Sequence, residues 1–177
     1  MSAIKNDEVI DSGAKSKTSV HGGEKYLTFF IGEESYAVPV LKVREIIRMQ
    51  PIHAIPEMPD YIRGIINLRG KIIPVVDMRV KFGIPSPTDS ERTGIIVVQG
   101  VFENQSIRQI GIVVDGVDEV VQITPQDRED APDFGVKLET QYINGIAKIK
   151  GKVVIMLEMD RVLSSEIIAN IQTKNQI

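Results

Sequence analysis

Side chains that could carry out chemistry are few and scattered in this sequence. The two histidines, His21 and His53, stand far apart, and the chain has no cysteine. There is therefore no thiolate nucleophile, no disulfide and no cysteine-type zinc site. The glycine-rich phosphate-binding patterns, His-Glu-x-x-His and Gly-x-Ser-x-Gly are also absent. A carboxylate pair would remain as a catalytic device, but no pair stands out, so we predict no catalytic, cofactor-binding or metal-binding residues and no enzyme.

One acidic segment contains Asp127, Glu129, Asp130 and Asp133. Oxygen ligands of this kind suit calcium, but the segment lacks the spacing and the central glycine of a calcium-binding loop. A solvated acidic face is the favoured interpretation, and calcium binding is the alternative.

The overall charge argues against a nucleic-acid partner. The formal net charge is −3, and the nine aromatic residues (four Tyr, five Phe) include no tryptophan. A single-strand-binding barrel needs a basic groove lined with aromatic platforms, so this alternative is weak. Apolar strand faces and a few placed charges suffice for protein recognition, which we predict instead.

A hairpin pattern occurs twice. The stretch Tyr61–Phe82 and the stretch Tyr142–Leu163 share seven identities in twenty-two positions without a gap. A second match precedes each copy, because Lys42–Arg48 (KVREIIR) resembles Gly116–Gln122 (GVDEVVQ). We predict two related structural units; chance similarity of two hydrophobic hairpins is the alternative.

The repeat also aligns charged residues of the first copy with residues of the same sign in the second. Glu119 falls on Glu45, and Lys150 falls on Arg69, at the corner of each hairpin. Each unit then has an acid and a base able to pair. An exposed ion pair worth about 0–1 kcal/mol is one interpretation, and a recognition site is the other, favoured slightly by the rigid donor fork of the arginine.

Short apolar runs predict the elements. In the first unit we expect strands followed by the Tyr61–Phe82 hairpin, and Leu41–Arg48 as a short helix or irregular turn. Five short strands in a unit of this size favour a small closed barrel. The strands expected in the two units, hairpins aside, are Tyr26–Gly32, Ser35–Val40 and Ile52–Ile55, then Thr93–Phe102, Ile107–Val114 and Glu119–Ile123.

The predicted organisation is a single domain between short termini. We expect a disordered tail over 1–23, a domain over 24–172 and a frayed end over 173–177. Within the domain, barrel one covers about 24–83 and barrel two about 92–157, followed by an amphipathic helix over 158–171. Thr124 and Pro125 predict the start of a further short helix. The tail lacks the apolar core of a secretory signal.

The order of these segments resembles a known family. YLTFFIGEESYAVPVLKVREII, YIRGIINLRGKIIPVVDMR, IGIVVDGVDEVV and YINGIAKIKGKVVIMLEMDRVL are similar to the bacterial chemotaxis coupling family, CheW, from about Glu24 to Leu163. Most specific is NLRG-x-x-x-P-V-x-D, Asn67 to Asp77, preceded by the KV-x-EI block at Lys42–Ile46. The resemblance implies a mainly β fold of two five-stranded SH3-like barrels around a shared core.

The resemblance also implies a function and a set of residues. Members are non-enzymatic adaptors, without a cofactor, that join the cytoplasmic hairpin tip of a chemoreceptor to the regulatory domain of the histidine kinase CheA. The expected location is the cytoplasm at membrane-bound receptor arrays. Kinase contacts can be placed only coarsely, on exposed barrel ends, and a free-standing coupler is expected because the chain ends soon after Leu163. The receptor-binding residues implied are Val43, Glu45, Gly64, Arg69, Gly111, Val117 and Val120.

Overall fold

The computed structural model describes residues 23–84, 87–101, 107–129 and 142–163, which form two β-sheets and four short helices. The six-stranded sheet has the order β8 (Gly116–Ile123), β1 (Glu24–Ile31), β2 (Glu34–Pro39), β11 (Lys152–Leu157), β10 (Ile143–Ile149) and β9 (Arg128–Glu129). The five-stranded sheet has the order β3 (Val43–Arg48), β6 (Gly94–Val101), β7 (Ile107–Val114), β5 (Lys71–Asp77) and β4 (Ile62–Leu68). The helices are η2 (Val40–Lys42), α2 (Met78–Lys81), η3 (Pro125–Asp127) and α3 (Met159–Val162). The predicted mainly β class is confirmed.

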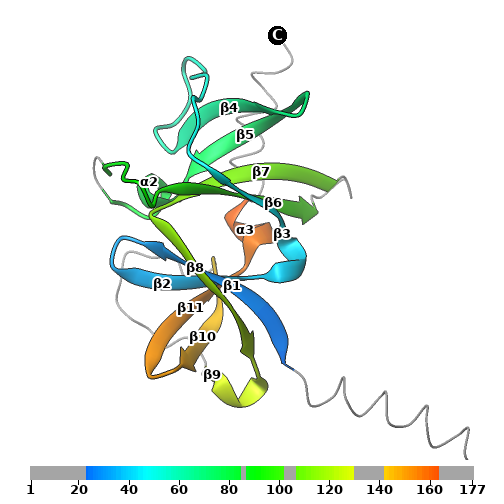
Figure 1. Ribbon diagram of the computed structural model, residues 1–177, viewed down its shortest axis with the longest axis vertical. Coiled ribbons are helices and arrows are strands. Elements are labelled where there is room, and N and C mark those ends of the chain that lie inside the picture. The colour runs from blue at the N-terminus through cyan, green and yellow to red at the C-terminus, as the bar shows by residue number, and fades with distance from the viewer. Residues whose placement is uncertain (1–22, 85–86, 102–106, 130–141, 164–177) are drawn as a thin grey trace, which may run out of the picture.

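Each sheet takes strands from both halves of the chain. Strand β11 pairs in parallel with β2, and β5 pairs in parallel with β7, so each hairpin joins strands of the other half. Figure 1 shows the result, with the blue β1 and β2 beside the orange β11 and the green β4 and β5 beside β7. The predicted barrels of about 24–83 and about 92–157 are therefore wrong in their strand content. Equivalent strands of the two halves carry the same apolar pattern, so the sequence does not distinguish pairing within a half from pairing between halves.

The two hairpins occupy equivalent places, as the repeat predicted. Arg69 and Lys150 both have φ of 53°, followed by Gly70 at 84° and Gly151 at 78°. Two successive positive φ values define the tight turn that matches the twist of a hairpin. Each hairpin is followed directly by a one-turn helix, α2 or α3.

The prediction for Leu41–Arg48 was wrong. Only Val40–Lys42 forms a 3₁₀ turn, and Val43–Arg48 is the edge strand β3, paired with β6. An edge strand is exposed on one face, so its alternation of apolar and charged residues resembles a short amphipathic helix. The predicted strand at Ile52–Ile55 is reduced to a single bridge between His53 and Ile65.

A shared core joins the two sheets. Its buried members come from both, among them Phe29 of β1, Val76 of β5, Ile112 of β7 and Leu157 of β11. Each sheet also has an apolar cluster of its own. The predicted shared core is thus confirmed, and burial of this kind supplies most of the stabilisation of a fold this size.

The C-terminal helix is described only at its start. Met159 and Val162 of α3 are buried, and Leu163 is buried directly after it. The remainder of the predicted helix, residues 164–171, lies outside the described residues, as do most of the predicted N-terminal tail and the predicted frayed end.

The chain crosses between the sheets twice, and an ion pair lies at each crossing. At the crossing from β2 to β3, Lys42 Nζ lies 3.2 Å from a carboxylate oxygen of Asp160 in α3. At the crossing from β7 to β8, Asp115 lies 3.2 Å from Nη1 of Arg79 in α2. The helix supplies the acid in one case and the base in the other.

Candidate functional site

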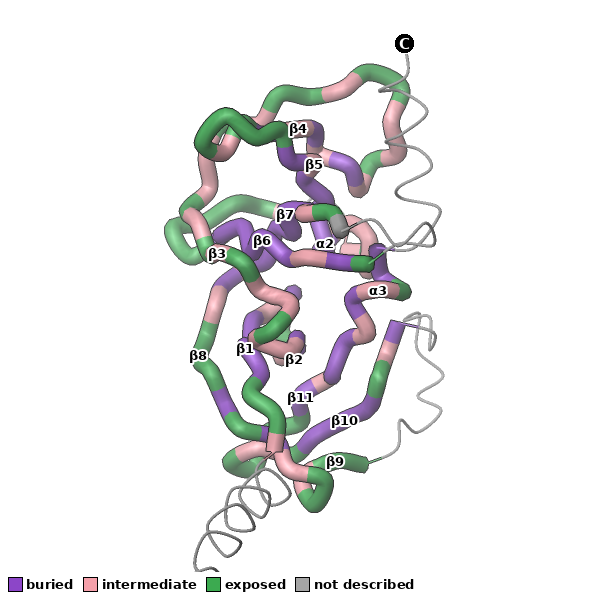
Figure 2. The backbone as a smooth tube through the Cα atoms, turned by 90° about the vertical axis from the view of Figure 1, so that its right-hand side faces the viewer, coloured by how far each residue is buried: buried purple, intermediate pink, exposed green. Residues whose placement is uncertain are grey.

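Strands β3 and β8 each form one edge of their sheets and are equivalent in the repeat. Along β3 the side chains alternate, so that Arg44, Ile46 and Arg48 are exposed. The middle of β8 is exposed over three successive residues, visible as a green stretch in Figure 2. Exposed edge strands with apolar residues are candidate surfaces for a partner, since unpaired strand edges otherwise invite aggregation.

Glu45 and Arg69 form a two-fold hydrogen-bonded ion pair across the five-stranded sheet. Nη1 of Arg69 donates to Oε2 of Glu45 at 2.9 Å, and Nη2 donates to Oε1. The Arg69 side chain is 74% exposed and that of Glu45 is 25% exposed. The hydrogen bonds from Arg69 lower the pKa of the Glu45 carboxyl, and the same bonds raise the pKa of the guanidinium.

The second copy has the corresponding pair. Lys150 Nζ donates to both carboxylate oxygens of Glu119, at 3.2 and 3.4 Å. Both predicted acid–base pairs therefore form. The first uses a planar fork and the second a single ammonium, so only the first holds its carboxylate in a fixed plane.

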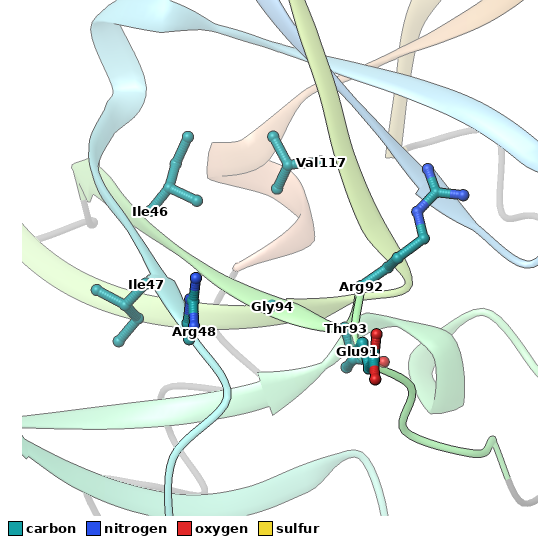
Figure 3. Close-up of a pocket in the computed structure, with 8 residues that line it drawn as sticks. All are labelled: Ile46, Ile47, Arg48, Glu91, Arg92, Thr93, Gly94 and Val117. Atoms are coloured by element: carbon teal, nitrogen blue, oxygen red, sulfur yellow. The ribbon is translucent and has the colours of Figure 1, made fainter.

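A pocket of about 280 Å³ opens between β3 and the start of β8. The side chains of Ile46 and Val117 project into the space between these strands (Figure 3). Val120, further along β8, is 55% exposed, while Val43 at the start of β3 packs partly against the shared core. Ile46 falls on Val120 in the repeat, and both are exposed. The predicted residues Val43, Val117 and Val120 thus lie on the two edge strands, together with Ile46, which the sequence analysis missed.

Gly64 and Gly111 lie inside the structure. Gly64 is buried at a bulge of β4 with φ of 140°, and a Cβ there would stand 1.9 Å from the backbone oxygen of His53. A Cβ on Gly111 would stand 2.8 Å from Cγ2 of Ile95. Neither residue offers a surface to a partner, so any effect of their substitution on binding would act through packing.

A buried arginine was also missed. Arg79 is fully buried, and its guanidinium reaches Asp77 at 2.9 Å, Asp89 at 2.7 Å and Asp115 at 3.2 Å. Burial acts to lower the pKa of Arg79, but the hydrogen bonds to these three carboxylates outweigh it and raise the pKa. An aspartate and an arginine two residues apart, directly after an apolar strand, were the available signal.

Two kinds of feature, a metal site and a membrane-spanning helix, bear on what the described residues can do. Among them no group of three or more potential ligands could hold a metal ion. None of the helices in the described ranges is both long and apolar enough to cross a bilayer. What the described surface offers is edge strands, exposed apolar side chains and ion pairs, which together define a protein-recognition module.

Comparison with known proteins gives the family. The CheW-like domain model matches residues 25–166, and the chain belongs to that family. It is 38% identical over 144 residues to a chemotaxis protein CheW of Klebsiella aerogenes, covering 81% of this chain and 84% of the relative. It is 30% identical over 151 residues to that of Rhizobium meliloti, covering 85% and 94%.

A solved structure agrees with this assignment. The scaffolding protein TtCheW of Thermoanaerobacter tengcongensis superposes with a TM-score of 0.71 at 35% identity, covering 81% of this chain and 90% of that one. The predicted family is confirmed, and the family with its relatives supports an adaptor role in chemotaxis.

Proposed function

We propose that this chain is a non-enzymatic adaptor that couples transmembrane chemoreceptors to the histidine kinase CheA. The cytoplasmic hairpin tip of the receptor would bind the edge strands β3 and β8, at Val43, Glu45, Arg69, Val117 and Val120. Gly64 and Gly111 would support this surface from within. The protein would act in the cytoplasm, at membrane-bound receptor arrays, without cofactor, metal or nucleic acid.

The observation that carries this proposal is the exposed Glu45–Arg69 pair beside exposed apolar residues on an edge strand. Arg69 is 74% exposed, so solvent screens the pair and it adds little to stability. A partner that covered it would exclude water and strengthen each hydrogen bond. An ion pair of little structural value that fixes a guanidinium in place is well suited to recognition.

The kinase would contact the exposed ends of the molecule. The hairpins β4–β5 and β10–β11 lie at opposite ends of the molecule (Figure 1). Each presents an exposed apolar residue at the second position after its turn, Ile72 at 58% and Val153 at 51% exposure. If copies of the kinase domain lie at both ends of this molecule in an array, each copy can bury one of these two apolar side chains.

Binding measurements test the proposal. The full chain should bind a soluble receptor hairpin fragment and the regulatory domain of the kinase, each separately and both together. Substitution of Arg69 should weaken the receptor complex only, whereas substitution of Ile72 and Val153 by Asp should weaken the kinase complex only. An intact chain that bound neither partner would refute the adaptor role.

A further inference from the structure

Strand β7 of the five-stranded sheet is joined to β8 of the six-stranded sheet by one residue, Asp115. Its backbone N–H donates to the carbonyl oxygen of Phe30 in β1 at 2.9 Å. Its carboxylate reaches both sheets: Oδ2 accepts from the backbone N–H of Gly32 at 2.6 Å, and Oδ1 accepts from Nη1 of Arg79 at 3.2 Å. Gly32 follows β1, whereas Arg79 lies in α2, directly after β5. One side chain therefore ties the two sheets together where the chain passes between them.

The guanidinium that Asp115 contacts is itself fixed in place. Arg79 is fully buried, and it is also held by Asp77 at 2.9 Å and by Asp89 at 2.7 Å. A buried charge with several hydrogen-bonded partners has few alternative positions, because each lost bond would leave a desolvated donor. Helix α2, which carries Arg79, stands beside the β7–β8 crossing (Figure 1). Asp115 is thus anchored to a fixed point of the five-stranded sheet.

The equivalent crossing, from β2 to β3, is held differently. There three residues, Val40–Lys42, lie between the strands, and Leu41 corresponds to Asp115 in the repeat. Leu41 is 89% exposed. The ion pair at this crossing joins Lys42 and Asp160, whose side chains are 30% and 37% exposed, so solvent screens it. The β7–β8 crossing is therefore the one at which the orientation of the two sheets is held more tightly.

The orientation of the sheets matters for the proposed receptor surface, which takes β3 from one sheet and β8 from the other. We propose that Asp115 is a positioning residue for receptor binding: it fixes the angle at which β8 leaves the five-stranded sheet, and thereby the place of β8 relative to β3. This inference rests on the proposed function. The two hairpins proposed to contact the kinase each lie within a single sheet, so a change of this angle would leave each of those contacts intact.

The test is removal of the Asp115 carboxylate. Asp115→Ala should raise the Kd for a soluble chemoreceptor hairpin fragment about fivefold, the size of effect expected of a residue that acts on a site indirectly. It should leave the Kd for the kinase regulatory domain within about twofold. Arg79 keeps Asp77 and Asp89 as partners in this variant, so the fold should persist. Asp115→Asn keeps an oxygen that can accept from Gly32 and should recover part of the affinity.

The matched control is Asp127→Ala. It removes the same charge from a carboxylate whose hydrogen bonds, from the N–H and the hydroxyl of Thr124, stay within one turn. It should leave both Kd values within about twofold. Residual dipolar couplings of the backbone amides report the orientation itself: the angle between the sheets in the free chain should change in Asp115→Ala and stay the same in Asp127→Ala.

Three outcomes refute the inference and leave the adaptor role standing. They are a normal receptor Kd in Asp115→Ala, an unchanged angle between the sheets in that variant, and an equal weakening of receptor and kinase binding, because a loss of stability would act on both partners. If Asp115→Ala does not fold, Asp115→Asn is judged by the same criteria. If the unchanged chain binds no receptor fragment, the proposed function fails and this inference fails with it.

Discussion

Arg69 and Lys150 occupy the same position of two equivalent turns, yet the bonds they make differ. The arginine holds Glu45 through two nitrogens, whereas the lysine reaches Glu119 through one. Both pairs are exposed enough that neither can contribute much to folding. The difference in geometry therefore has its main consequence for binding.

Arg69→Glu should weaken receptor binding at least tenfold while the protein stays folded. The change places two carboxylates beside each other at the proposed receptor surface and removes the forked donor. Calorimetric titration with the receptor fragment measures the loss, and circular dichroism verifies the fold. Lys150→Glu is the matched control, which should alter receptor binding much less. Loss of the folded state in Arg69→Glu would instead assign Arg69 a structural role.

The Glu45 carboxyl should titrate at lower pH than an ordinary glutamate. Arg69 lowers the pKa of the Glu45 carboxyl in the folded state. The ion pair therefore stabilises the fold at pH values above the pKa of the unfolded state, and this stabilisation is lost as the pH falls through the pKa of the folded state. Carbon-detected NMR titration of Glu45 gives the midpoint directly. Arg69→Ala should move that midpoint upward, and an unchanged midpoint would contradict the ion pair.

Residue-level prediction from the sequence succeeded where the repeat supplied a second copy. Equivalent charges at Glu45 and Glu119, with Arg69 and Lys150, indicated both pairs. The pocket had no such signal, because its lining residues Arg48 and Arg92 are distant in sequence and come to one pocket only through the pairing of β3 with β6. The burial of Arg79 was equally hidden, since a charged residue is rarely predicted to be buried.

At the scale of the element, two equivalent glycines at strand bulges have different surroundings. Gly64 has φ of 140° and the His53 backbone against it, whereas the nearest atom to a Cβ on Gly145 would be Nη2 of Arg128 at 3.6 Å. The close approach exists only in the first copy, where the segment around His53 bridges to Ile65.

Gly64→Ala should therefore destabilise the protein by at least about 2 kcal/mol more than Gly145→Ala. The first variant suffers a backbone clash and a disfavoured φ, and the second only ordinary contacts. Urea unfolding of both variants gives the comparison. Equal effects would mean that the His53 segment can move away at little cost.

Arg79→Ala should cost about 3 kcal/mol of unfolding free energy, because it removes the buried partner of Asp77, which is 1% exposed, and leaves only the partly exposed Arg63, at 3.1 Å, to pair with that carboxylate. Arg79→Lys should recover part of this by keeping the charge. Arg161→Ala on the equivalent helix α3 is the control; Arg161 is exposed, so the change should stay within about 0.5 kcal/mol. Urea denaturation monitored by circular dichroism measures all three, and a small effect of Arg79→Ala would show that Arg63 alone suffices to pair with Asp77.

At the scale of the whole molecule, each half of the chain depends on the other. Strands β1 and β2 complete the sheet of the second hairpin, and β6 and β7 complete that of the first. The sequence predicted two similar units and a shared core, but not this exchange. The choice between pairings is made by tertiary contacts that local patterns do not encode.

Fragments of residues 1–86 and 87–177 should each fail to fold alone. Neither contains a complete sheet, and each would expose unpaired strand edges and half of the shared core. Mixed together, they should regain β structure and a cooperative thermal transition, as measured by circular dichroism and size-exclusion chromatography. A cooperative transition in either fragment alone would contradict the dependence.

In the ion pairs at the two crossings between the sheets, α3 contributes an acid, Asp160, and α2 contributes a base, Arg79. This difference affects whether the strands pair within one half of the chain or between the halves. The two crossings are equivalent, because Lys42 corresponds to Gly116 in the repeat. If the strands of each half paired only with one another, α2 would therefore lie beside the β2–β3 crossing, and α3 would lie beside the β7–β8 crossing. Arg79 would then approach Lys42, and Asp160 would approach Asp115. In both halves like charges would then lie together, and in the first half one of them would be a buried guanidinium. This electrostatic repulsion disfavours pairing within a half, whereas pairing between the halves places opposite charges together.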